Sequence, residues 1–299
     1  MLATSGMKMK NKYPIFIPTK GRYERPITIN MFKSHGVDFK IVIENQEYGQ
    51  YSKIVDKSKI LVVPHRDEGL TVTRNWLWDY AEDMGYEKFW TFDDNIGRVY
   101  RWNRNRRLQM KDGMYIRIVE DFADRYSNLH IIGMNYSGFC KSRDKIPAYY
   151  PNTRVYSNML LTTRARFSNG KKIRNELFYN DDTDLCLRVL KDGLPTIQIN
   201  AFLIDKAATM TVKGGMTDYY LSDECQGRYK FAQELQEAHP DVTQITKKFN
   251  RWHHQVDYKP FKRNKLIRKD GLIIKDGINN YGMKLINLEE RSVKDMQFA

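Results

Sequence analysis

The chain has 299 residues, of which 41% are hydrophobic and 13% aromatic, so it can bury the core of one large domain or two small ones. Its 50 basic and 36 acidic residues give a formal net charge of +14, which favours an anionic partner such as nucleic acid, a nucleotide or a membrane surface. The three scattered cysteines argue against a disulfide framework or a structural zinc site. We find no apolar run of ~18 residues and no signal-peptide pattern, so we expect a cytoplasmic protein without a membrane partner.

The first hundred residues alternate short apolar runs with segments of helical character. Strands are predicted over 13–18, 39–43, 60–63 and 89–92, where apolar residues run up to a proline, an acid or a glycine. Helices are predicted over 28–35 and 73–84, each followed by a glycine that stops it. This alternation predicts a mostly parallel sheet with helices on both faces.

The later chain continues the alternation less regularly. Helices are predicted over 113–125, 181–192 and 222–238, and strands over 129–134, 157–163, 196–199 and 201–204. Residues 146–158 look like a loop, and the final stretch looks like a β-hairpin or tail. We expect a main domain over 10–245 and a basic C-terminal extension over 246–299 that packs on the same domain.

Two carboxylates and an amide, Asp93-Asp94-Asn95, follow the strand at 89–92. Adjacent acids in a turn after a strand are common and need no function. Open α/β sheets nevertheless bind ligands at the carboxyl ends of their strands. Neighbouring carboxylates repel each other unless a cation joins them, and Mg²⁺ or Mn²⁺ takes oxygen ligands and substrate phosphates. The stretch therefore predicts a metal–diphosphate site at the tip of a central strand.

A second acidic stretch, Asp181-Asp182-Thr183-Asp184, opens a predicted helix. Acids in a first turn interact favourably with the helix dipole, so simple capping explains them equally well. In a partly desolvated cleft, one of these acids would instead act as a general base towards an alcohol.

Polar residues also follow the other predicted strands. The turn Thr19-Lys20-Gly21-Arg22 is either a plain tight turn or a site for a nucleotide or diphosphate. Glu44 ends the second strand, where an acid often bonds a ribose, although plain surface is the simpler interpretation. With Thr73 as the expected N-cap, Arg74 in the first turn opposes the helix dipole, and an anionic ligand would remove that conflict.

Three basic stretches, 98–111, 164–174 and 247–269, would ordinarily be solvated surface. Here aromatic residues are interleaved with them, which is the composition of a nucleic-acid groove. The candidate nucleic-acid contacts are Arg98, Arg101, Trp102, Arg104, Arg106, Arg107, Lys171 and Lys172. His253 and His254 are either an exposed pair or include one ligand to a metal or phosphate.

Together these motifs resemble a GT-A glycosyltransferase: the turn at 18–22, the acid at 44, Gly-Leu-Thr-Val-Thr-Arg-Asn at 69–75, Asp-Asp-Asn at 93–95 and Asn-Asp-Asp-Thr-Asp-Leu-Cys-Leu-Arg at 180–188. More narrowly, residues 13–255 are similar to the phage TET-associated glycosyltransferases, relatives of the kinetoplastid base J glucosyltransferase. The resemblance implies a Rossmann-like α/β fold, a UDP-sugar donor such as UDP-glucose or a UDP-arabinose, and divalent Mn²⁺ or Mg²⁺. It implies 5-hydroxymethylcytosine or 5-hydroxymethyluracil in DNA as acceptor, within a phage-infected bacterial host.

The resemblance also implies roles for single residues. Asp93 falls beside the donor ribose, Asp94 on the metal and Asp182 on the catalytic acid, with Asp181 in place of the usual Glu. The other donor-side positions are Thr19, Lys20, Arg22, Glu44, Arg74 and Asn95. His254, or else His253, would complete the metal shell. Asn95 replaces a third acid, which implies weaker metal affinity or metal-optional activity.

The expected reaction is a direct displacement that inverts the configuration of the sugar, with Asp182 taking the proton of the acceptor hydroxyl. The two carboxylate clusters would also suit glycoside hydrolysis, but the cationic strand ends favour a diphosphate donor. Two alternatives remain at this point: a metal-dependent nuclease or nucleotidyltransferase, and a non-catalytic DNA-binding domain on a decayed transferase scaffold. The sugar, the base and the oligomeric state stay open.

Overall fold

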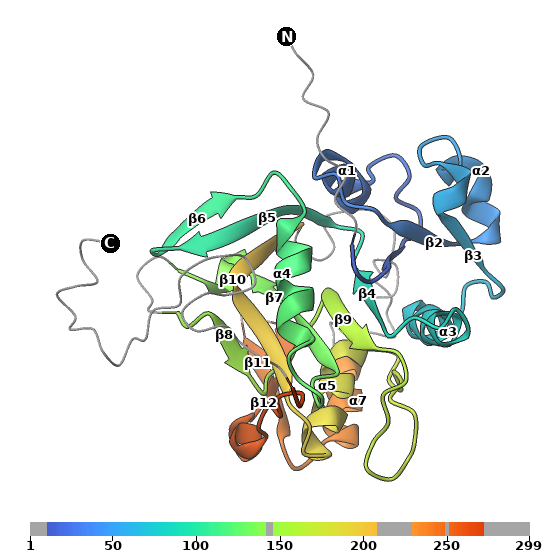
Figure 1. Ribbon diagram of the computed structural model, residues 1–299. Helices are drawn as coiled ribbons and strands as arrows, with labels where there is room; N and C mark the ends of the chain where they lie inside the picture. The colour runs from blue at the N-terminus through green and yellow to red at the C-terminus, as the bar shows by residue number, and fades with distance from the viewer. Residues whose placement is uncertain (1–10, 142–145, 208–228, 249–250, 272–299) are drawn as a thin grey trace. The chain divides into compact units, whose positions relative to one another are not determined.

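A computed structural model describes residues 11–141, 146–207, 229–248 and 251–271 (Figure 1). The chain divides into two compact units, Met1–Ile267 and Arg268–Ala299. The predicted start of the helix at 222–228 and the predicted hairpin or tail at the C-terminus lie outside the described residues. All of the candidate site residues belong to the first unit.

In the described part of this unit, ten strands form one mixed sheet in the order β3-β2-β1-β4-β9-β7-β10-β5-β6, with β8 beside β10. The strands are β1 (Ile15–Pro18), β2 (Lys40–Glu44), β3 (Ile60–Val63), β4 (Lys88–Phe92), β5 (Ile96–Asn103), β6 (Arg106–Gln109), β7 (Ile131–Tyr136), β8 (Tyr149–Pro151), β9 (Asn158–Thr162) and β10 (Thr196–Lys206). β1 to β4 run parallel, β9 is antiparallel between β4 and β7, and β10 is parallel to β7. The strands β1, β2, β3, β4, β7 and β10 therefore all end at one edge, the carboxyl edge.

Helices cover both faces of the sheet, as the sequence predicts. They are α1 (Ile27–Ser34), α2 (Tyr48–Tyr51), α3 (Leu70–Asp83), α4 (Met114–Ala123), α5 (Asp181–Lys191) and α7 (Tyr229–Ala238), with short 3₁₀ turns η1 (Asn45–Glu47), η2 (Lys57–Lys59), η3 (Ser137–Phe139) and η5 (Lys259–Arg263). Apolar residues of α1 and α4 pack with Ile15 and Ile17 on one face, while those of α3 and α5 pack with Phe16 on the other. Alternate residues of the short β1 thus face two separate cores. The α/β fold class is confirmed.

Four regions differ from the sequence prediction. The basic stretch after Asn95 forms the hairpin β5–β6, whose β6 is exposed along its whole length and therefore lacks the apolar alternation that marks a strand. The loop-like region contains β8, and a second small sheet, β11 (Thr243–Lys248) with β12 (Arg251–Val256), forms where only a basic stretch is predicted. The two strands predicted within 196–204 are one strand, β10, whose register with β7 shifts between Ile199 and Leu203.

The helix predicted from Thr73 begins three residues earlier, at Leu70. Gly69, at φ 92°, takes the N-cap position, a backbone angle that glycine adopts readily. No helix in the described ranges has both the length and the apolar character that crossing a membrane requires.

Candidate functional site

The start of α1 fixes the turn that carries the first acid pair, Asp93 and Asp94. The Thr28 hydroxyl donates to the carbonyl of Asp93 (2.7 Å) and accepts from the amide of Ile96 (2.8 Å). The Thr28 amide also donates to the carbonyl of Asp94 (3.2 Å). One buried threonine thus satisfies the backbone of the turn on three sides, and the acids are held in place at the carboxyl edge.

Asp94 is buried among residues that follow β1. The Thr19 hydroxyl donates to its Oδ2 (2.8 Å), and the Arg22 guanidinium forms an ion pair with its Oδ1. Tyr51 supports this arrangement, because its hydroxyl bonds that of Thr19 (2.8 Å) and accepts from the Arg22 amide (3.2 Å). Burial raises the pKa of Asp94, although the charge of Arg22 opposes the rise. The structure therefore brings together Thr19, Arg22 and Asp94.

Arg74 joins the two acid pairs. Its Nη2 lies 3.2 Å from Oδ1 of Asp93, and its Nη1 lies 2.5 Å from Oδ2 of Asp181. The side chain is buried, and the two carboxylates hold its pKa above the usual value although burial alone would lower it. Because α3 begins at Leu70, Arg74 is not in the first turn, and the predicted conflict with the helix dipole is wrong. Its partners are carboxylates of the chain itself.

Lys206 is a member of the site that the sequence analysis does not identify. Its Nζ lies 3.1 Å from Oδ2 of Asp93 and donates to the hydroxyl of Ser157 (2.8 Å). Although burial opposes it, the charge of Asp93 raises the pKa of Lys206. Its position could have indicated its role, because it is the last residue of a strand that ends at the carboxyl edge. The predicted strand stops at 204, two residues short of Lys206, so the prediction leaves Lys206 outside the sheet.

The second acid pair, Asp181 and Asp182, begins α5, and its two members differ. Asp181 is buried against Arg74; burial raises its pKa and the charge of Arg74 opposes the rise. Asp182 is only partly buried. Their shared position in the first turn of α5 agrees with the expected helix start. The two neighbouring acids are thus separated into one with a fixed cation and one that faces a less enclosed space.

The charge of Asp182 acts on a second group of residues, of which Arg154 is also absent from the sequence prediction. The Arg154 guanidinium lies over the ring of Tyr156, 4.1 Å from its centroid. Burial would lower the pKa of Arg154, but the charge of Asp182 contributes to raising it. Burial and the charge of Arg154 lower the pKa of His254 to about 4, while Asp182 opposes that shift. At neutral pH the imidazole of His254 is therefore uncharged.

Glu44 and Asn95 are both buried at the same edge. The Lys20 ammonium lies 3.1 Å from each carboxylate oxygen of Glu44, and the Asp67 amide donates to the same carboxylate (3.1 Å). With 7% of its surface exposed, Glu44 is not the plain surface residue of the simpler interpretation. The Asn95 side-chain oxygen is buried and has no hydrogen-bond partner among the described residues. It is an acceptor that a ligand hydroxyl would satisfy.

The described ranges contain no ready-made cluster of metal-binding side chains. There, no three His, Cys, Asp or Glu side chains are grouped so that they could hold a metal ion. The charges that act on His254 are those of Arg154, Asp182 and His253, which belong to the Asp182 side of the site. Asp94 alone fits, as an oxygen ligand of the kind that Mg²⁺ and Mn²⁺ prefer.

The predicted nucleic-acid residues fall into two groups. Arg98, Arg101, Arg104, Arg106 and Arg107, the hairpin arginines, are all exposed on β5–β6, and Trp102 pairs across the hairpin with Arg107. Lys171 and Lys172 follow β9, whose last residue pairs with the first residue of β4, so their loop starts at the amino edge of the sheet. Lys172 is paired there with Glu82 (2.9 Å). The structure does not bring the two groups together.

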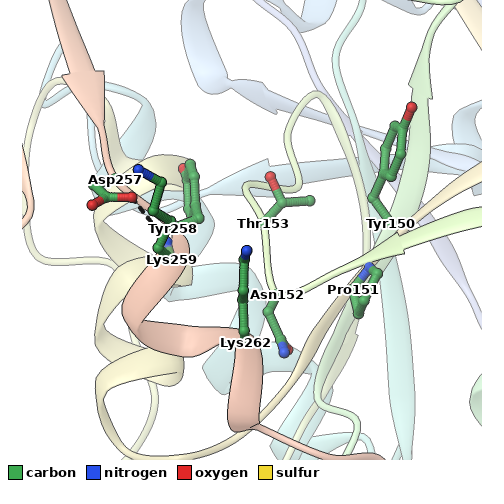
Figure 2. Close-up of a pocket in the computed structure, with 8 residues that line it drawn as sticks. All are labelled: Tyr150, Pro151, Asn152, Thr153, Asp257, Tyr258, Lys259 and Lys262. Atoms are coloured by element: carbon green, nitrogen blue, oxygen red, sulfur yellow. Dashed lines mark hydrogen bonds between the residues drawn. The ribbon is translucent and has the colours of Figure 1, made fainter.

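A separate cavity of about 360 Å³ lies between β8 and the turn before η5. Figure 2 shows its two walls, which are Tyr150, Pro151, Asn152 and Thr153 on one side and Asp257, Tyr258, Lys259 and Lys262 on the other. Tyr258 also experiences the charges of Arg154 and Asp182. It contains none of the residues singled out from the sequence.

The sequence matches the family described as TET-Associated Glycosyltransferase over residues 13–215. Solved structures with a similar arrangement include A197 from STIV (13% identity, 66% of this chain and 85% of that one, TM-score 0.40) and S. aureus TarS 1-349 (11%, 86% and 99%, 0.41). TarS 1-349 in complex with UDP is also similar (13%, 76% and 66%, 0.42). These likenesses are too distant to carry an argument about activity.

No curated protein sequence matches the chain. The family match, however, covers more than half of the 299 residues and includes both acid pairs and Arg74. The resemblance seen in the motifs is thereby confirmed, and the protein belongs to the TET-associated glycosyltransferase family and is a glycosyltransferase.

Proposed function

We propose that the protein transfers a sugar from a UDP-sugar to the hydroxyl of 5-hydroxymethylcytosine or 5-hydroxymethyluracil in DNA. The observation that carries this proposal is the contact of Arg74 with both Asp93 and Asp181. It joins an acid pair at the tip of a central strand to an acid pair at the start of a helix. Glycosyl transfer needs this combination, because one side has to hold the diphosphate donor and the other has to take a proton from the acceptor.

The reaction we propose is a single displacement. The hydroxyl oxygen of the acceptor forms a bond to the anomeric carbon, and the bond from that carbon to the diphosphate oxygen breaks. UDP leaves with the electron pair of that bond, and the acceptor proton passes to Asp182. Asp182 suits this role because it is partly exposed, whereas Asp181 is occupied by Arg74 and acts as a positioning residue. This geometry inverts the configuration of the sugar.

The charge balance at the donor side supports a divalent metal. Cations of the chain already lie on each acid there: Arg22 on Asp94, Arg74 and Lys206 on Asp93, and Lys20 on Glu44. A bound diphosphate therefore adds negative charge that these pairs do not offset. Mn²⁺ or Mg²⁺, held by Asp94 and by the diphosphate itself, would neutralise the leaving group.

DNA as the acceptor is supported by the hairpin arginines and by the family's association with TET oxygenases. Five exposed arginines on one hairpin suit a phosphate backbone. Charged side chains on an exposed edge strand also prevent it from pairing with a strand of another molecule, which is the simplest structural role of these arginines. A hydroxymethyl group stacked inside a duplex cannot reach Asp182, so the acceptor nucleotide has to be extruded or single-stranded.

The test is to incubate the protein with oligonucleotides that contain 5-hydroxymethylcytosine or 5-hydroxymethyluracil and with a panel of UDP-sugars in Mn²⁺. Nucleosides from the digested DNA are then analysed by mass spectrometry. We expect one hydroxymethyl nucleoside to gain the mass of one sugar residue, and DNA without the hydroxyl to gain none. If all nucleosides keep their mass, the proposed acceptor is wrong.

Two further reactions test the metal dependence and the nuclease alternative. Removing the metal with EDTA should slow the transfer at least about tenfold, and added Mn²⁺ should restore it. An unchanged rate in EDTA would contradict only the metal. A reaction without nucleotide sugar tests the nuclease alternative, for which cleavage of the DNA backbone is the expected product.

A further inference from the structure

Phe139 is a large apolar side chain that the fold leaves in water. It ends η3, the turn that follows β7 at the carboxyl edge, and 62% of its surface is exposed. A single exposed apolar residue needs no explanation. Phe139 differs because its ring stacks on another aromatic ring and because hydrogen bonds fix the turn that carries it.

Phe139 is the outer member of an aromatic row with Tyr136 and Tyr156. Its ring stacks on that of Tyr136, with centroids 5.7 Å apart and planes at 23°. Tyr136 meets Tyr156 edge to face at 4.5 Å. The inner end of the row is Arg154, 4.1 Å from the Tyr156 ring, which senses the charge of Asp182. The row thus runs from solvent to the side of the site where Asp182 lies.

The same row also contacts the donor side. The Tyr136 hydroxyl bonds that of Ser157 (2.8 Å), and the ammonium of Lys206 lies 5.2 Å from the Tyr136 ring. Lys206 in turn pairs with Asp93. Tyr136 therefore lies between the two acid pairs, where donor and acceptor have to meet.

Two hydrogen bonds fix the turn that exposes Phe139. The Ser137 hydroxyl donates to Oδ1 of Asp205 (3.1 Å), and Nη2 of Arg107 donates to the carbonyl of Cys140 (2.8 Å). The second bond ties the turn to the hairpin arginines. Trp102, directly across from Arg107, shares its face of the hairpin. Cations for phosphates and an exposed ring for bases thus lie side by side, which is the composition of a single-strand groove.

We propose that Phe139 stacks on the base next to the acceptor nucleotide in DNA, while Tyr136, Tyr156 and Arg154 receive the acceptor base itself. This inference rests on the proposed function. An acceptor nucleotide that leaves the stack deprives its neighbour of a stacking partner, and an exposed ring held in place replaces that partner. The acceptor base then enters along the row and carries its hydroxymethyl group towards Asp182.

The experiment compares wild-type protein with Phe139→Ala, Phe139→Trp and the control Met84→Ala. Met84 is similarly exposed, at 52%, but follows α3 at the amino edge. We expect Phe139→Ala to raise the KM for hydroxymethylated DNA about tenfold, which is within the range for loss of one base–aromatic stack. Phe139→Trp should restore most of the affinity, Met84→Ala should change little, and the KM for the UDP-sugar should stay constant in all variants.

A second set of oligonucleotides identifies the base that Phe139 contacts. An abasic analogue replaces the nucleotide on the 5′ side or on the 3′ side of the acceptor. At the side where Phe139 stacks, the difference between wild type and Phe139→Ala should shrink from about tenfold to about twofold, because the shared contact is already lost. On the other side the difference should persist.

Three results would overturn the inference: an unchanged KM for DNA in Phe139→Ala, a raised KM for the UDP-sugar instead, or a difference that persists with both abasic oligonucleotides. The second result would assign the ring to the donor. If wild-type protein modifies no DNA at all, the proposed function fails separately. The same abasic comparison measured by fluorescence anisotropy of DNA binding then still decides whether Phe139 stacks on a base.

Discussion

Arginines meet carboxylates at both edges of the sheet, but in opposite proportions. At the carboxyl edge, Arg74 alone contacts both Asp93 and Asp181, and its side chain is buried. At the amino edge, Glu82 at the end of α3 alone accepts from Arg166, Lys172 and Arg174. Glu82 is partly exposed to solvent, and Lys172 is exposed. One buried cation thus links two acids at the carboxyl edge, whereas three cations surround one acid at the more exposed amino edge.

The difference shows which of two similar charge clusters is a site. Like charges near solvent cost little, because water screens their repulsion. Buried carboxylates that share one cation are costly to bring together, and such clusters are typical of functional sites. In the sequence the two clusters look alike, because each consists of acidic and basic residues near a helix. Burial is the property that separates them.

The largest expected effect tests this comparison directly. Arg74→Met would leave Asp93 and Asp181 close together without their shared cation, and we expect a loss of about 3–5 kcal/mol in the free energy of unfolding. For a chain of this size that is a fall of roughly 10 °C in the melting temperature. The control Arg174→Met removes an arginine from the partly exposed Glu82 cluster, where two other cations remain on Glu82, and should cost about 1 kcal/mol or less. If the two variants lost equal stability in urea or thermal unfolding, burial would not distinguish the two clusters.

The next effect separates the two members of the second acid pair. Asp182→Asn should slow sugar transfer about 10²- to 10⁴-fold, because the general base is lost, and should leave the melting temperature nearly unchanged. Asp181→Asn should instead lower the stability, because Arg74 loses a buried partner. Initial rates and thermal unfolding of both variants are the measurements. A normal rate in Asp182→Asn would show that another group takes the proton.

The sequence was sufficient for features that are local. Asp93 and Asp94 follow a largely aromatic strand, and Asp181 and Asp182 open an amphipathic helix, so short-range patterns place both pairs at element ends. The parallel order of the first strands follows from the same patterns. These features needed no knowledge of distant contacts.

The features that could not be predicted depend on contacts between distant segments. Lys206 belongs to the site because β10 lies beside β7, and Arg154 because residues before β9 lie near α5 and β12. The hairpin β5–β6 carries too many exposed charges to show a strand pattern. The surroundings of His254 could not be predicted either, because the charges of Arg154 and Asp182 that act on it come from distant segments.

An intermediate effect concerns the exposed cations of the hairpin. Arg101 and Arg106 lie on the same face of β5–β6, and we expect the double variant Arg101→Ala/Arg106→Ala to raise the KM for DNA about tenfold at moderate salt. The slope of log affinity against log salt should decrease by about two, one for each phosphate contact. The control Lys57→Ala removes an exposed charge from η2, beside β3 at the far end of the sheet. An unchanged salt slope in the double variant would limit the arginines to protecting the edge strand.

The smallest expected effect is at the amino edge, where Lys172→Ala decides between two roles for a predicted DNA contact. Lys172 is the largest cause that lowers the pKa of Glu82 to about 2, with burial opposing and Arg166 and Arg174 assisting. Because the folded pKa is below the usual 4.5, the stabilisation is fully present above about pH 4.5 and is lost as the pH falls towards 2. Arg166 and Arg174 remain in the variant, so at pH 7 we expect a loss of less than about 1 kcal/mol.

At lower pH the variant should lose stability earlier than wild type, since Glu82 takes up its proton at a higher pH without Lys172. Urea unfolding at pH 7 and pH 3.5 measures this, and the KM for DNA measured beside it should stay within about twofold of wild type. A rise in KM as large as that of the hairpin double variant would instead place Lys172 in the DNA interface. The excess of cations at the amino edge would then be a second nucleic-acid surface, and burial alone would no longer separate the functional cluster from the structural one.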